Sequence, residues 1–150
     1  MRHPIPRAPE ALRRVALHEA AHAVVAERLG IRVERASIQL IGAEGGSVAV
    51  EGLTDAPDAA ELETRIREML AGRAADIVFS GRPDAGSASD LQEATRMAAA
   101  LHVATGLGGK LAVRASFRDA ARVLDRDADL VRRVEADLAR LSASVAVPYG

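Results

Sequence analysis

The sequence predicts a mainly α-helical domain with a small β-hairpin or sheet edge, and three observations carry this prediction. Hydrophobic residues make up 49% of the 150 residues, aromatic residues only 2%, and alanine is abundant, which favours closely packed helices over a β-sandwich. Long stretches repeat apolar residues at helical spacing, whereas residues 33–51 show the alternation typical of strands. At this length we expect a single domain over residues 1–150 with one core.

Composition also excludes several classes of function. The formal net charge is −1 with both signs interspersed, so no basic surface for nucleic acid or for an anionic membrane is expected. Cysteine is absent, so any metal site must use histidine or carboxylate ligands. No apolar run approaches the ~20 residues of a membrane segment, and we expect a cytoplasmic protein.

The predicted fold begins with a leader, a helix and a hairpin. Residues 1–9 carry three prolines and are expected to form an extended leader. A helix is predicted over 10–29, ending at Gly30 as a C-terminal cap. The alternation in 33–51 is interrupted by a glycine-rich turn at 42–46, which indicates a β-hairpin.

A loop at 52–58 leads into a long amphipathic helix. Its apolar stripe follows the helical period and consists of Leu62, Ile66, Met69, Leu70, Ile77 and Val78. Gly72 lies inside this helix, where glycine costs about 1 kcal/mol relative to alanine. We therefore expect Gly72 to permit a close contact with another helix.

Two further helical regions complete the predicted fold. Ser89 and Gln92 fit a capping box, with Ser89 as the N-cap of a helix that runs to Gly106. Residues 117–143 predict one or two helices, with one apolar face formed by Val131, Val134, Leu138 and Leu141.

The most informative motif is His18-Glu19-Ala20-Ala21-His22, in the first predicted helix. Two imidazoles four residues apart project from the same side of a helix and can share one metal ion. Glu19 lies beside the first histidine, where it can reach a water bound to that metal. This is the HExxH arrangement of zinc peptidases, with two ligands and a general base on one turn. The flanking residues are alanine, leucine and valine, and ionisable groups in such an apolar helix need a partner.

A catalytic zinc usually has three protein ligands and one position for water. His3 lies in the leader and His102 among apolar residues, so both are better explained without a metal. Asp90 is attractive because the start of a helix favours the ionised carboxylate that binds metal. Asp76, near the end of the long helix, is the rival, and spacing alone leaves both open.

Three motifs make the chain resemble the peptidase domain of the FtsH-type ATP-dependent zinc metalloproteases over about residues 10–115. HEAAHAVVA at 18–26 is similar to that family's HEAGHAVVA, and AGRAADIVFSG at 71–81 to its GGRAAEELVFG. AGSASDLQEATRMA at 85–98 resembles its GASNDLQRATxxA segment. The resemblance implies a helical zinc-peptidase domain with its strand edge beside the active site.

The resemblance also implies roles for individual residues and partners. It assigns the third zinc ligand to Asp90, beside His18 and His22, and gives Asp76 a supporting role behind the ligands. We therefore expect a zinc-dependent endopeptidase with Glu19 as its base, acting on peptides or unfolded polypeptides. The alternative is a non-catalytic or partner-dependent interaction domain that the metal stabilises.

The family normally carries a membrane segment and an ATPase module before the peptidase domain, and a longer helical C-terminal end than this chain has. We therefore expect a stand-alone peptidase domain without the ATPase module. A third hypothesis is a domain that works only when it is paired with a separate ATPase partner. The family assembles into a ring-shaped hexamer, so the resemblance implies further copies of the chain as a candidate partner, but the shorter C-terminal end argues against the complete ring.

Overall fold

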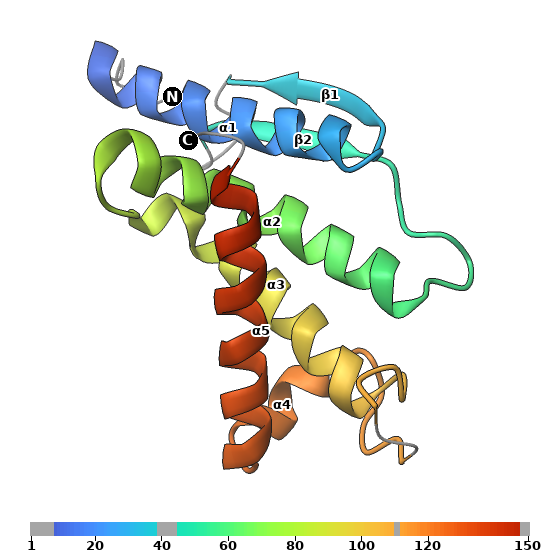
Figure 1. Cartoon of the computed structure of the whole chain (residues 1–150). Helices are drawn as coiled ribbons and strands as arrows, with labels where there is room; N and C mark the ends of the chain where they lie inside the picture. The colour runs from blue at the N-terminus through green and yellow to red at the C-terminus, as the bar shows by residue number, and fades with distance from the viewer. Residues whose placement is uncertain (1–7, 39–44, 110–111, 148–150) are drawn as a thin grey trace, which may run out of the picture.

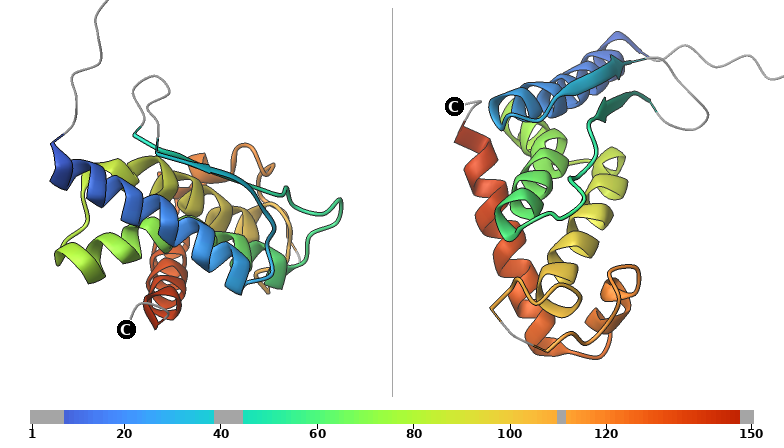
Figure 2. Two further views of the ribbon diagram at one scale, coloured as in Figure 1. Left: turned by 90° about the horizontal axis from the view of Figure 1, so that it is seen from above. Right: turned by 90° about the vertical axis from the view of Figure 1, so that its right-hand side faces the viewer.

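The computed structural model describes residues 8–38, 45–109 and 112–147. The mainly α prediction is confirmed, because the elements are helices apart from one two-stranded antiparallel sheet in these residues. Helix α1 and the hairpin lie together at one end, and α2, α3 and α5 extend away from them (Figures 1 and 2). The leader over 1–7 and the hairpin turn over 39–44 fall outside the described residues.

Helix α1 spans Pro9–Arg28, so it begins and ends one residue earlier than predicted. Proline is suited to the first turn of a helix because its missing N–H group has no helical partner there. Pro9, assigned to the leader, therefore begins the helix instead. Gly30 follows the cap residue Leu29 with φ of +76°, a left-handed conformation that stops the helix as predicted.

The hairpin consists of β1 (Val33–Ser37) and β2 (Ser47–Val50). They pair antiparallel, with Val33 opposite Val50 and Ser37 opposite Ser47. Both strands pack against α1, which places the start of β2 beside the middle of that helix.

Helix α2 (Ala59–Ser80) is the centre of the packing and contacts α1, α3 and α5. Its N-terminus is capped by Asp58, whose carboxylate accepts a hydrogen bond from the backbone N–H of Glu61. The core gathers around α2, and its largest fully buried side chains are Leu62, Ile66, Leu70, Leu130, Leu141, Val25 and Val103.

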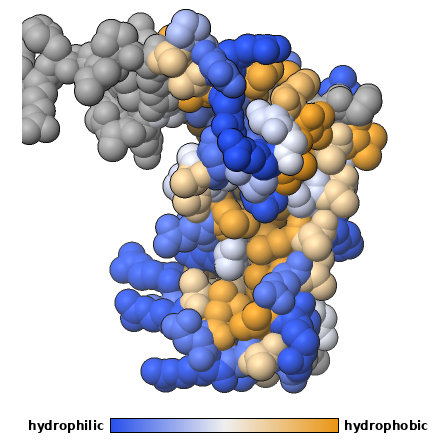
Figure 3. Space-filling view, turned by 90° about the vertical axis from the view of Figure 1, so that its left-hand side faces the viewer, coloured by the Kyte–Doolittle hydropathy of each residue, from blue (hydrophilic) through white to orange (hydrophobic). Residues whose placement is uncertain are grey.

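The last turns of α2 depart from the predicted apolar stripe. Ile77 and Val78 are 39% and 41% exposed. They line a shallow apolar groove between α2 and α5. Figure 3 shows hydrophobic residues along the middle of one face of the molecule. Helical periodicity identifies the residues on one face but not the length over which neighbouring helices cover that face.

Helix α3 (Ala88–Val103) follows a short 3-10 turn, η1 (Ala85–Ser87). The predicted N-cap, Ser89, is wrong: Ser87 holds that position without a side-chain capping bond. The carboxylate of Asp84 accepts from the Gly86 N–H and starts the turn earlier, so the helix begins before Ser89 is reached. Helix α3 also ends three residues before the predicted Gly106.

The C-terminal region forms two helices, α4 (Ala120–Leu124) and α5 (Ala128–Ala146). Asp127 caps α5 through the N–H of Leu130, and this break separates the two helices. Three of the four predicted positions on the apolar face meet the core, but Leu130 is buried there in place of Val131.

Candidate metal centre

His18 and His22 lie on the inner face of α1, one turn apart, as the motif predicts. They are 9% and 5% exposed, and the neighbouring positions Ala21 and Val25 are buried in the core. Their side chains point toward α2 rather than into water. Buried imidazoles of this kind require polar partners.

Helix α2 supplies those partners to the Nδ1 atom of each ring. The His18 Nδ1–H donates to Asp76 Oδ2 at 3.0 Å, and the His22 Nδ1–H donates to the backbone oxygen of Glu68 at 2.9 Å. A Glu68 carboxylate oxygen lies 3.4 Å from the same His22 nitrogen. Both acids are buried, at 4% exposure for Asp76 and 7% for Glu68. With the protons held on Nδ1, the lone pairs of both Nε2 atoms are directed to the opposite side.

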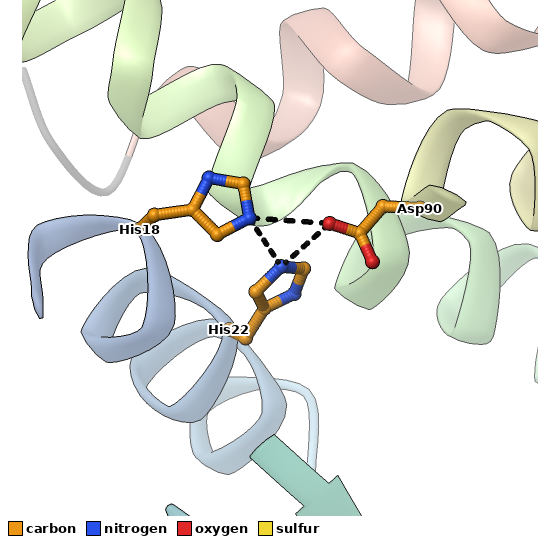
Figure 4. Close-up of side chains that lie close together, drawn as sticks. All are labelled: His18, His22 and Asp90. Carbon is orange, nitrogen blue, oxygen red and sulfur yellow. Dashed lines mark hydrogen bonds and ion pairs between the residues drawn. The ribbon is translucent and has the colours of Figure 1, made fainter. Parts of the chain in front are cut away.

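Asp90 meets the two Nε2 atoms from the first turn of α3 (Figure 4). Its Oδ2 lies 3.1 Å from His18 Nε2 and 3.2 Å from His22 Nε2, while the two nitrogens are 3.3 Å apart. Asp90 and Asp76 therefore occupy different places: Asp90 faces the Nε2 atoms, and Asp76 lies behind His18. Residues from three helices converge here, although 72 positions separate His18 from Asp90 in sequence.

The dimensions of this triangle fit a zinc ion. Zinc–ligand bonds of about 2.0–2.1 Å in tetrahedral geometry separate neighbouring ligand atoms by about 3.3–3.4 Å. The three observed separations of 3.1–3.3 Å are close to that edge length. Two neutral imidazoles and one carboxylate are also a donor set that suits zinc. The residues present therefore fit the metal.

The electrostatics of the cluster favour a positive charge among the three groups. Burial alone lowers the pKa of His22, but hydrogen bonds to Asp90 and Glu68 outweigh it and raise this pKa to about 10. Burial also lowers the pKa of His18, but hydrogen bonds to Asp90 and Asp76 outweigh burial and raise this pKa above its ordinary value. Burial raises the pKa of Asp90, but the bonds to both histidines lower it to about 2. Protons or a metal ion can supply that positive charge.

Glu19 shares a cleft of about 820 Å³ with the three residues. The walls come from α1, α2, the start of β2 and the η1–α3 region, and include Gly46, Ser47 and Val48 of the hairpin. Gly46 lies so close to Glu19 that a Cβ at position 46 would be 2.7 Å from Glu19 Cγ. The hairpin is therefore beside the candidate site.

An ion pair holds the segment that leads to Asp90. Arg14 Nη2 of α1 lies 3.0 Å from Asp84 Oδ2, just before η1. The other Asp84 oxygen accepts from the Gly86 N–H at 2.7 Å. Asp84 thus connects the turn before α3 to the helix that carries the histidines.

Sequence reasoning missed Glu68. A signal was present, because Glu68, Gly72 and Asp76 are spaced four residues apart and so share one face of a helix. His102 lies outside the site, half-buried, with its Nε2 2.8 Å from Asp137 Oδ2. His3 falls outside the described residues.

The chain is similar to proteins that are named as zinc metalloproteases. The sequence model of Peptidase family M41 matches residues 7–140. ATP-dependent zinc metalloprotease FtsH 1 of Sorangium cellulosum is 37% identical over 114 residues, which cover 73% of this chain and 18% of that protein. ATP-dependent zinc metalloprotease FtsH 2 of Symbiobacterium thermophilum is 34% identical over 146 residues, which cover 91% of this chain and 25% of that protein.

The chain thus spans about a fifth to a quarter of the length of these relatives. Among the described residues, no helix combines the length and apolar character needed to cross a membrane. The family match covers most of the chain, including all of the residues that form the candidate centre. The chain belongs to Peptidase family M41.

Proposed function

We propose that the chain is a zinc-dependent endopeptidase in which His18, His22 and Asp90 hold the metal. The observation that carries this proposal is the convergence of His18 Nε2, His22 Nε2 and Asp90 Oδ2 within 4.8 Å, in a cleft that also contains Glu19. Membership of a peptidase family and the names of both relatives, which are zinc metalloproteases, support it.

Each residue has a definite part in the proposed reaction. When bound, zinc supplies the Lewis acidity that activates a water molecule and polarises the scissile carbonyl. Glu19 takes the proton of the attacking water and delivers it to the leaving amine. Asp76 and the Glu68 carbonyl hold the protons on the Nδ1 atoms, which keeps both Nε2 atoms available as ligands.

The hairpin supports a proposal about the kind of substrate. Strand β2 lines the cleft with Ser47, Val48 and Val50, and an extended peptide can add to it as a further strand. Such pairing requires an extended backbone, so we propose peptides and unfolded polypeptides as substrates. Because the two relatives are named as ATP-dependent, we also propose that a separate ATPase delivers folded substrates.

The test compares hydrolysis of an unfolded protein by the wild type and by Glu19→Gln, each with and without a zinc chelator. Zinc content is measured on the same samples. We expect chelator-sensitive cleavage by the wild type, and a loss of about 100-fold or more in Glu19→Gln with zinc retained, because the general base is removed. Glu27→Gln is the matched control, since Glu27 is an exposed glutamate of the same helix.

Cleavage that is unaffected by the chelator would contradict the proposal. Zinc binding without cleavage, even when an ATPase partner is supplied, would instead favour a non-catalytic domain that the metal stabilises.

A further inference from the structure

Helices α1 and α2 run antiparallel where they cross at the candidate centre (Figure 1). His22 meets Glu68, whereas His18, one turn earlier in α1, meets Asp76, two turns later in α2. Gly72 lies midway between these acids in sequence and on the same helical face. It is therefore the residue of α2 that lies against both imidazoles.

The space that a side chain at position 72 would need is already filled by the two rings. A Cβ there would lie 2.3 Å from His18 Nε2, 2.4 Å from His18 Cε1 and 2.6 Å from His22 Nε2. Favourable contacts between such atoms begin at about 3.5 Å. The nitrogens in collision are the same atoms that face Asp90. Either ring could escape the contact by turning, but it would then withdraw its nitrogen from the centre.

The backbone gives no other reason for glycine at this position. Gly72 lies in the interior of α2 and is not among the glycines with positive φ. In a helix interior, glycine is less favourable than every residue except proline. Its lack of a side chain does bring the α2 backbone close to α1, and the His22 Nδ1–H reaches the backbone oxygen of Glu68 at 2.9 Å.

We propose that Gly72 is a positioning residue of the metal centre. Its missing side chain leaves the volume in which both imidazoles stand with Nε2 facing Asp90 and Nδ1 facing α2. This inference rests on the proposed zinc site, because that site gives the ring arrangement its purpose. The residue touches the ligands and takes no part in proton transfer.

Gly72→Ala tests the inference through zinc affinity, measured by competition with a chromophoric chelator. We expect the zinc dissociation constant to rise at least 100-fold, because neither imidazole can keep its position. Gly52→Ala is the matched control: a Cβ there meets no atom within 4 Å, and Gly52 has no positive φ. Affinity within threefold of the wild type in Gly72→Ala would overturn the inference. If the wild type itself binds no zinc, the proposed function fails, and the variants below test the inference.

A second set of variants tests the steric argument if Gly72→Ala fails to fold or if no protein binds zinc. His18→Asn with His22→Asn replaces each ring by an amide, which can keep the bond made by Nδ1 but lacks the Cε1 and Nε2 atoms. In this background we expect Gly72→Ala to fold and to melt no lower than its parent. A collapse of the fold in both backgrounds would show that Gly72 serves helix packing in general, and would overturn the inference.

Discussion

Replacing Asp76 with asparagine tests whether the α2 acids tune the metal ligands or only fill the core. The substitution keeps the size of the side chain but removes its charge. Asp76 is 4% exposed and accepts the His18 Nδ1–H at 3.0 Å. An asparagine oxygen can still accept this bond. Its amide group can also turn and donate to Nδ1, which would move the ring proton to Nε2 and block ligation there.

The magnitude follows from the change in that hydrogen bond. A bond to a charged acceptor contributes about 1.5–3 kcal/mol and a neutral one about 0.5–1.5 kcal/mol, a difference of roughly 1 kcal/mol. The loss of negative charge behind the ligand adds to this, because groups that orient a metal-bound histidine typically change affinity 10- to 100-fold. We therefore expect zinc to bind 10- to 100-fold more weakly to Asp76→Asn, or about 1.4–2.7 kcal/mol.

The assay is a competition titration at pH 7.5, with circular dichroism to verify that the variant is folded. Asp55→Asn is the matched control, because Asp55 is exposed in the loop before α2. A folded Asp76→Asn protein with wild-type zinc affinity would refute the reasoning. It would mean that Asp76 acts only as a packed polar residue of the core.

Two further predictions separate catalysis from metal binding. Gly46→Ala should lower kcat while zinc affinity stays within about threefold, because the new Cβ would lie 2.7 Å from Glu19 Cγ and displace the base, not the ligands. Loss of zinc together with activity would contradict this assignment. Zinc affinity should rise by about tenfold per pH unit for each proton displaced between pH 6 and 8, since zinc needs a neutral His22 whose pKa is raised to about 10. Asp90, with a pKa of about 2, is ionised throughout this range and adds nothing to the pH dependence of zinc affinity. Calorimetric titrations in which zinc affinity does not change between pH 6 and 8 would refute this prediction.

Local sequence was sufficient for the part of the site that one helix carries. The spacing of His18 and His22 follows from helical geometry, and the apolar residues around them indicate burial. The end of α1 was also close to that observed, because Gly30 provides a strong local signal, and the loop predicted over 52–58 ends where α2 begins. These features depend on neighbours in sequence, which is why they could be predicted.

The identity of the proposed third metal ligand could not be derived from local sequence in the same way. Asp76 and Asp90 are both helical acids, and spacing alone does not say which imidazole nitrogen each one meets. That depends on how α2 and α3 cross α1, and therefore on long-range packing. The error at Ser89 has a related cause. A capping box competes with the Asp84 turn, and the turn begins the helix first.

The same packing orients the imidazole rings of the candidate centre. Glu68 and Asp76 are buried acids, and burying a charge is unfavourable unless a hydrogen-bonded partner compensates it. His22 and His18 provide that compensation from α1, so the contacts that relieve the two acids also fix the orientation of both rings. A metal ion at the proposed site would have few groups to order, which favours tight binding. In this arrangement the stability of the helix pair and the geometry of the ligands depend on the same four side chains.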